Sequence, residues 1–155
     1  MIRPSFMLLV LILPSFCMAS SNQWDDYIQK IQQAEFKTLQ AFPAHIASIG
    51  DGLDDERAEE LTTAMSIALI KDPLSVIKAT RSSDKSKDPL LQRFGTSLIC
   101  SIPGMTHFTS EEVLAYFSRA ELSLKVAGPA AEQCLQTMRE TMHEFRQDSA
   151  QYPLK

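Results

Sequence analysis

Apolar residues along most of the chain recur at intervals of three and four, and no long stretch alternates apolar with polar residues. Intervals of three and four place side chains on one face of an α-helix, whereas alternation is typical of a β-strand. The pattern therefore predicts an all-α protein. Prolines and five glycines divide the chain into short segments, which favours a compact, irregular bundle of five to six helices.

The first half of the chain is expected to contain two main helices. The first spans Gln23–Ala41 and ends before the next proline, because proline cannot donate a helical hydrogen bond. A short helical turn follows over Ala44–Ile49, and then a turn with two glycines. Asp54 or Asp55 caps the second helix, which runs to about Lys71.

A repeated start signal predicts two further helices. Asp72 and Asp88 each precede a proline, and this pair suits the N-cap and the first position of a helix. We expect a short helix over Pro73–Thr80 and a longer one over Pro89–Ser101. The intervening Arg81–Lys87 contains no apolar residue, which predicts an exposed, mobile loop. The start signal has no third copy, so a repeat array is not indicated.

The last third of the chain is expected to form two helices. Thr109 and Glu112 have the spacing of a capping box, and a glycine–proline pair ends the helix that they begin. The final helix spans Ala130–Gln147, with its apolar residues at helical spacing. The tail from Asp148 is expected to fray.

The N-terminus resembles a secretory signal in its three-part layout. Arg3 precedes the apolar run Phe6–Leu13, and Pro14 and small residues follow up to Ala19. Eight apolar residues extend about 12 Å as a helix, too short for a hydrocarbon core of about 30 Å. We expect residues 1–19 to be removed after Ala19, which leaves one helical domain over 20–155 in the periplasm or outside the cell. Lipid anchoring at Cys17 is the alternative, and the bulky Phe16 disfavours it.

The charge balance limits the classes of partner. Removal of residues 1–19 takes away only Arg3, so the remaining chain has 14 basic and 19 acidic residues and a net charge of −5. Nucleic acid and anionic membranes bind to positive surfaces, so neither is an expected partner, and stable membrane insertion is not expected. The stretch Lys71–Arg93 is locally basic and Asp51–Glu60 is acidic. Solvated helix ends explain this polarity most simply, and a contact surface is the alternative.

Two cysteines, Cys100 and Cys134, remain after the predicted cleavage. Export would place them in an oxidising compartment, where paired thiols form disulfides. We therefore predict one disulfide, Cys100–Cys134, between two helices. Two buried free thiols are the alternative.

No pattern of reactive residues predicts a catalytic site, a metal or a cofactor. Glu140 and His143 have the spacing of a di-iron motif, but the second glutamate–histidine pair that such a site needs is absent. His45, His107 and His143 lie in three different segments. Ser97 lacks the following glycine of a nucleophile elbow, and the acids of Asp51–Glu60 do not match a calcium-binding loop.

Some apolar residues lie off the main helix faces. They can thicken the core, support self-association or line a groove for a partner. These residues are Phe36, Ile67, Ile70, Tyr116 and Leu122.

Together these features predict a non-enzymatic, exported binding protein that docks on another protein. An immunity or inhibitor protein acting on a basic toxin or hydrolase fits this description, because opposite charges speed association. The alternative is a periplasmic carrier or chaperone that holds an apolar ligand or an unfolded segment between helices. An enzyme that uses Glu140 and His143 is the third hypothesis.

Overall fold

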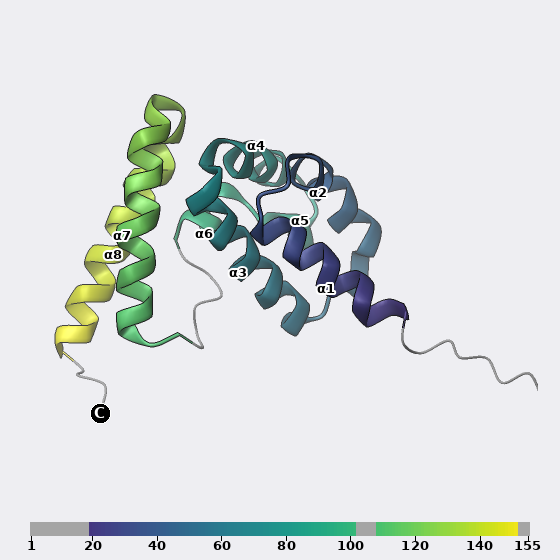
Figure 1. The fold of residues 1–155 in the computed structure, drawn as a ribbon, viewed down its shortest axis with the longest axis horizontal. Coiled ribbons are helices and arrows are strands. Elements are labelled where there is room, and N and C mark those ends of the chain that lie inside the picture. Colours follow the sequence, from purple (N-terminus) through teal and green to yellow (C-terminus); the bar gives the residue numbers. More distant parts are fainter. Residues whose placement is uncertain (1–18, 102–107, 152–155) are drawn as a thin grey trace, which may run out of the picture.

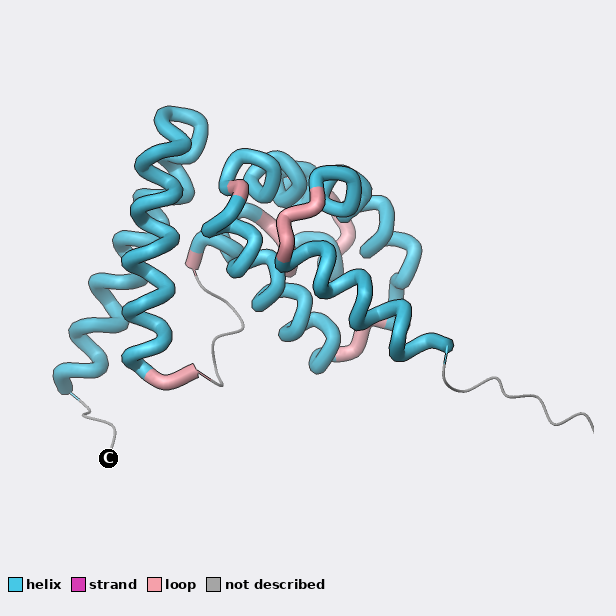
Figure 2. The backbone as a smooth tube through the Cα atoms, in the orientation of Figure 1, coloured by secondary structure: helices cyan, strands magenta, loops and turns pink. Residues whose placement is uncertain are grey.

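The computed structural model describes residues 19–101 and 108–151, which form helices joined by short turns (Figures 1 and 2). Six helices have 12 to 20 residues, two are short, and there is no strand in the described part. The predicted all-α, irregular bundle is confirmed. The elements are α1 (Ala19–Gln32), α2 (Phe36–Ile49), the 3-10 turn η1 (Gly50–Gly52), α3 (Asp55–Lys71), α4 (Pro73–Asp84), α5 (Pro89–Gln92), α6 (Thr96–Cys100), α7 (Ser110–Ala127), the 3-10 turn η2 (Gly128–Ala131) and α8 (Glu132–Gln151).

Helix α3 lies at the centre of the packing. It contacts α1, α4, α6 and α7, while α2 packs against α4 (Figure 1). Helices α7 and α8 form a hairpin at one side of the molecule, on the left of Figure 2. The core is one cluster of buried apolar side chains that extends from Ile31 in α1 to Met138 in α8. None of the described helices combines the length and the apolar composition needed to cross a bilayer.

The predicted helix starts are confirmed where the capping residues are polar. Asp54, Asp72 and Asp88 each accept a hydrogen bond from a backbone N–H in the first turn that follows. Thr109 and Glu112 form the predicted capping box at the start of α7. The hydrogen bonds from Thr109 hold the pKa of the Glu112 carboxyl below its usual value, because they favour the charged form.

The predicted helix over Gln23–Ala41 is wrong, because α1 ends at Gln32 and α2 begins at Phe36. Ala34 adopts a left-handed backbone conformation with φ of 58°. Its N–H donates to the carbonyl of Ile31 at 2.8 Å, and the N–H of Glu35 donates to that of Lys30 at 3.0 Å. This pair of bonds is the usual C-terminal motif of a helix, but the left-handed position is normally glycine.

The prediction that the helix ends before Pro43 is wrong, because Pro43 lies inside α2. A proline in a helix interior costs about 3 kcal/mol, because a hydrogen bond is lost and the ring collides with the preceding turn. Leu39, Phe42 and Ile46 lie on both sides of it and are at most 1% exposed. Burial of each large apolar side chain contributes about 1.5–3 kcal/mol. Core packing therefore outweighs the local cost and joins the predicted turn over Ala44–Ile49 to α2.

The exposed loop predicted over Arg81–Lys87 is wrong for its first half. Helix α4 continues to Asp84, and Ser83 is fully buried. The Asp84 carboxylate accepts a hydrogen bond from the Thr96 backbone N–H at 2.8 Å, which ties the end of α4 to the start of α6. Arg81 and Asp84 therefore extend this helix with hydrogen-bond partners elsewhere in the fold, at Ala130 and Thr96.

The single helix predicted over Pro89–Ser101 is divided into α5 and α6. Phe94 lies in the break, is fully buried, and packs edge-on against Phe42 with ring centroids 5.7 Å apart. A side chain on the next residue, Gly95, would collide with the carboxylate of Asp84. A larger residue here would have to displace the carboxylate that binds the Thr96 N–H.

The end of the chain also differs from the prediction. The turn η2 occupies the residues after Gly128, and α8 then runs to Gln151. The fraying predicted from Asp148 is therefore wrong as far as Gln151. Residues 152–155 lie outside the described part, as do residues 1–18 with the predicted leader and Cys17.

The Cys100–Cys134 disulfide is present, as predicted, and joins the last residue of α6 to the first turn of α8. The two Cα atoms are 5.3 Å apart, and the residues are 34 positions apart in the chain. Both cysteines are buried, at 1% and 2% exposure. The bridge thus attaches the α7–α8 hairpin to the rest of the bundle.

Replacement of Ala34 by glycine is expected to stabilise the protein by about 0.5 kcal/mol. The left-handed conformation costs an alanine about 1–2 kcal/mol, which exceeds the added entropy cost of glycine of about 0.5–1 kcal/mol. Ala41→Gly, at an exposed position inside α2, is the control and should lower the free energy of unfolding by about 0.5–1 kcal/mol. Urea denaturation measures both values, and equal losses for the two variants would contradict the left-handed turn.

Cys100→Ala and Cys134→Ala should each lower the melting temperature by a similar amount, about 10 °C. Opening a loop of this length costs about 3–4 kcal/mol in the chain-entropy model, and each kcal/mol shifts the melting temperature by several degrees. The double variant should lose little more than either single one. Additive losses in calorimetry would show that the two residues stabilise the fold separately.

Candidate functional site

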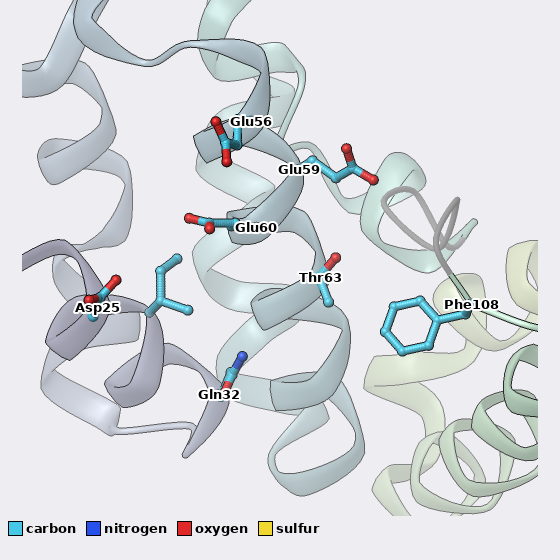
Figure 3. Close-up of a pocket in the computed structure, with 8 residues that line it drawn as sticks. Asp25, Gln32, Glu56, Glu59, Glu60, Thr63 and Phe108 are labelled. Atoms are coloured by element: carbon cyan, nitrogen blue, oxygen red, sulfur yellow. The ribbon is translucent and has the colours of Figure 1, made fainter. Parts of the chain in front are cut away.

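A hollow of about 420 Å³ lies between α1 and α3 (Figure 3). Phe108, just before α7, closes one side of it. We call this hollow the acidic groove. Its lining residues are Asp25, Ile28 and Gln32 from α1, Glu56, Glu59, Glu60 and Thr63 from α3, and Phe108.

Helical spacing explains how these side chains come together. Asp25, Ile28 and Gln32 follow one another at intervals of three and four, so they lie on one face of α1. The same intervals separate Glu56, Glu59 or Glu60, and Thr63 on α3. Other faces of α3 are buried in the core. The packing of α1 against α3 therefore brings two polar stripes to the edges of one groove.

Trp24 of α1 and Arg57 of α3 connect the two helices that form the groove. The indole Nε1 of Trp24 donates a hydrogen bond to Oε2 of Glu60 at 2.6 Å. The Arg57 guanidinium lies over the Trp24 ring, 5.4 Å from its centroid, which is the geometry of a cation–π contact. The two contacts join the first turns of α3 to α1 and fix the Glu60 carboxylate at the groove.

The groove has a strongly negative lining. It has four carboxylates, and none of its described lining residues is basic. Concave surfaces with charges of one sign concentrate the electrostatic field and attract ions of the opposite sign. Ile28 and Phe108 add apolar surface, and Phe108 is 39% exposed. The groove can therefore bind a lysine or arginine side chain, whose apolar stem and cationic end match both kinds of lining.

The structure does not gather the described titratable residues into a metal site. Among the described residues, no group of three or more histidine, cysteine, aspartate or glutamate side chains is placed to hold a metal ion. Glu140 and His143 are exposed on α8, and Glu140 accepts a hydrogen bond from Gln136 at 3.0 Å. His45 is on α2, and His107 lies outside the described residues. Ser97 is exposed on α6.

The acids of Asp51–Glu60 take separate roles. Asp54 caps α3, and Asp55 pairs with Arg93 at 3.0 Å. Glu56, Glu59 and Glu60 line the acidic groove. The Asp55–Arg93 pair also connects the acidic segment with the basic stretch Lys71–Arg93. Helix capping thus explains Asp54, and the glutamates form a concave surface.

A second polar hollow of about 360 Å³ lies between α1 and α2. The rings of Tyr27 and His45 meet there at a tilt of 42° with centroids 4.2 Å apart, and Lys30 pairs with Asp26 at 2.6 Å. Burial raises the pKa of the Tyr27 phenol, because it disfavours the charged form. Basic and acidic side chains are mixed in this hollow, so it lacks the uniform charge of the acidic groove.

The apolar residues predicted to lie off the main faces have different environments. Tyr116 is in the core at 3% exposure, and Ile70 packs against the core. Phe36 and Leu122 are 58% and 64% exposed, and Val126, one turn after Leu122, is 81% exposed. The first pair thickens the core, whereas Phe36 and Leu122 remain available at the surface.

Sequence reasoning missed the acidic groove as a site. The signal was present in the spacing of Glu56, Glu59 and Glu60 on one helix and in Asp25 on another. The sequence did not reveal that α1 pairs with α3, because the break at Ala34 that separates α1 from α2 was not foreseen.

Comparison with protein-family models, with curated proteins and with solved structures finds no match to this chain.

Proposed function

We propose that this protein is an exported, non-enzymatic binding protein that docks on a basic partner protein through the acidic groove. The groove itself is the observation on which the proposal depends, because it combines four carboxylates with the apolar Ile28 and Phe108. In interfaces of this kind, charge complementarity speeds association, and buried apolar contacts slow dissociation.

Two features support export. The first 19 residues have the layout of a secretory signal. The buried Cys100–Cys134 disulfide suits an oxidising compartment such as the periplasm. Neither feature depends on the acidic groove, so export and docking can be tested separately.

Within this class, we propose an immunity or inhibitor protein that blocks a basic toxin or hydrolase. Such a protein needs a rigid, preformed surface, since ordering a flexible one on binding weakens affinity. Trp24 and Arg57 fix one edge of the groove through contacts between α1 and α3. A preformed acidic surface could cover the basic substrate-binding face of such an enzyme.

A carrier or chaperone is the second candidate. The exposed Phe36, Leu122 and Val126 favour it, because apolar surface can hold an apolar ligand or an unfolded segment.

Export predicts that native material lacks residues 1–19 and has no free thiol. Intact-mass analysis of protein purified from its native compartment should find a chain that begins at Ser20. A thiol-reactive reagent should not modify it until a reductant is added. A retained leader or two reactive thiols would contradict export and oxidation, and would leave the docking surface to be judged by its own experiment.

Docking predicts that a double variant, Asp25→Asn with Glu56→Gln, loses a partner that the wild-type protein captures from a native-compartment extract. Both residues are exposed, so their replacement should leave the fold intact. Loss of two charges at the groove should reduce the association rate with the captured partner several-fold and weaken its dependence on salt. Surface plasmon resonance at two salt concentrations measures both effects.

The matched control is Glu144→Gln with Asp148→Asn, which removes the same charge from exposed positions on α8. This control should keep the wild-type association rate. Capture of no partner at low or moderate salt, or equal effects of the two double variants, would refute docking through the acidic groove.

A further inference from the structure

A second, mainly apolar groove lies between α2 and α4 and has a volume of about 150 Å³. We call it the α2–α4 trough. Its lining residues are Phe36, Leu39, Gln40 and Pro43 from α2 and Ser75, Lys78, Ala79 and Ser82 from α4.

The two walls of the trough differ in chemistry. On each helix the lining residues are spaced by three and four over seven positions, so each wall is about 10 Å long. The α2 wall presents Phe36, Leu39 and Pro43, which are apolar. The α4 wall presents Ser75 and Ser82 at its ends, with Lys78 between them. The trough is therefore apolar along one side and has a cation at the middle of the other.

Phe36 and Lys78 are both exposed at the edges of the trough. Phe36 is 58% exposed, whereas Phe42, Phe94 and Phe117 are at most 1% exposed. Lys78 is exposed and forms no ion pair within the described part of the chain. An apolar ring and an unpaired ammonium thus border the same hollow, beside the buried Leu39.

We propose that the α2–α4 trough binds a straight-chain carboxylate of the length of hexanoate to octanoate, which matches walls of about 10 Å. The carboxylate pairs with the Lys78 ammonium, and the Ser75 hydroxyl lies on the same wall as a hydrogen-bond donor, whereas the Ser82 hydroxyl already donates to the carbonyl of Ala79. The alkyl chain lies against Phe36, Leu39 and Pro43. A cavity of about 150 Å³ holds a group of the size of benzene, so the trough accepts one slim chain and excludes bulky lipids.

Charge and shape together select this ligand. Among the described residues that line the trough, Lys78 alone is charged, which favours an anion over a cation or a neutral chain. The acidic groove lies between a different pair of helices, α1 and α3. Ligand binding in the α2–α4 trough therefore does not depend on the proposed docking function.

The test is an NMR titration of the full chain with octanoate and, separately, with octylamine, below the concentrations at which either self-associates. These probes have the same alkyl chain and opposite charges. Octanoate should shift the amide signals of both trough walls and bind about two- to fivefold more tightly than octylamine, the range expected for a partly exposed ion pair. Hexanoate should bind more weakly than octanoate, by up to about fourfold for each missing methylene.

Lys78→Glu should reverse the preference, so that octylamine binds more tightly than octanoate. Lys85→Glu, which makes the same charge change at an exposed residue after α4, is the matched control and should keep the preference for octanoate. Phe36→Ser should weaken both probes equally, because it removes apolar contact without a change in charge.

Four results would overturn the proposal. They are shifts outside α2 and α4, equal affinity for the two probes, a preference that Lys78→Glu leaves unchanged, and concentration-dependent shifts of the trough amides without ligand. The last result would assign the trough to self-association, and tight binding of an acidic helical peptide in place of octanoate would assign it to a protein partner.

Discussion

The burial of α3 on several sides is the constraint on which the rest of the structure depends. Its buried residues include Leu61, Ala64, Met65 and Ala68, and the helix contacts α1, α4, α6 and α7. A helix that is apolar on more than one face can be stable only if several neighbours cover it. The short α5 and α6, the break at Phe94 and the path of α7 are consistent with this requirement, since each places apolar side chains against the same core.

The same constraint explains where the polar surfaces lie. With most of α3 covered, its first turns expose a single stripe, and the glutamates of that stripe meet the polar face of α1. The locally basic stretch of the chain lies elsewhere, with Lys78 and Arg81 on α4 and Lys85 and Lys87 in the turn that follows it. The separation of charge along the chain thus becomes a separation in space, with the Asp55–Arg93 pair between the two regions. A fold with α3 at the surface would have dispersed these charges.

Much of the fold was predictable where a signal is local. Helix starts at Asp54, Asp72, Asp88 and Thr109 follow from side chains that bond to nearby backbone groups, and the disulfide follows from a count of cysteines. The errors have tertiary causes. Ala34 takes a conformation that glycine usually signals, Pro43 is retained by the burial around it, and Asp84 has its partner 12 residues away at Thr96. The acidic groove needed the pairing of two helices, so its individual carboxylates were visible in the sequence but their common surface was not.

The position of the disulfide also determines the order in which the molecule can be assembled. Cys134 follows seven of the eight described helices in the chain, and chains emerge from synthesis N-terminus first. The partner thiol, Cys100, therefore waits while the whole of α7 is made. During this interval, α1 to α6 have only non-covalent contacts to hold them together. Covalent closure is consequently a late event that locks an existing arrangement, and the extensive burial around α3 is what allows the nascent chain to reach it.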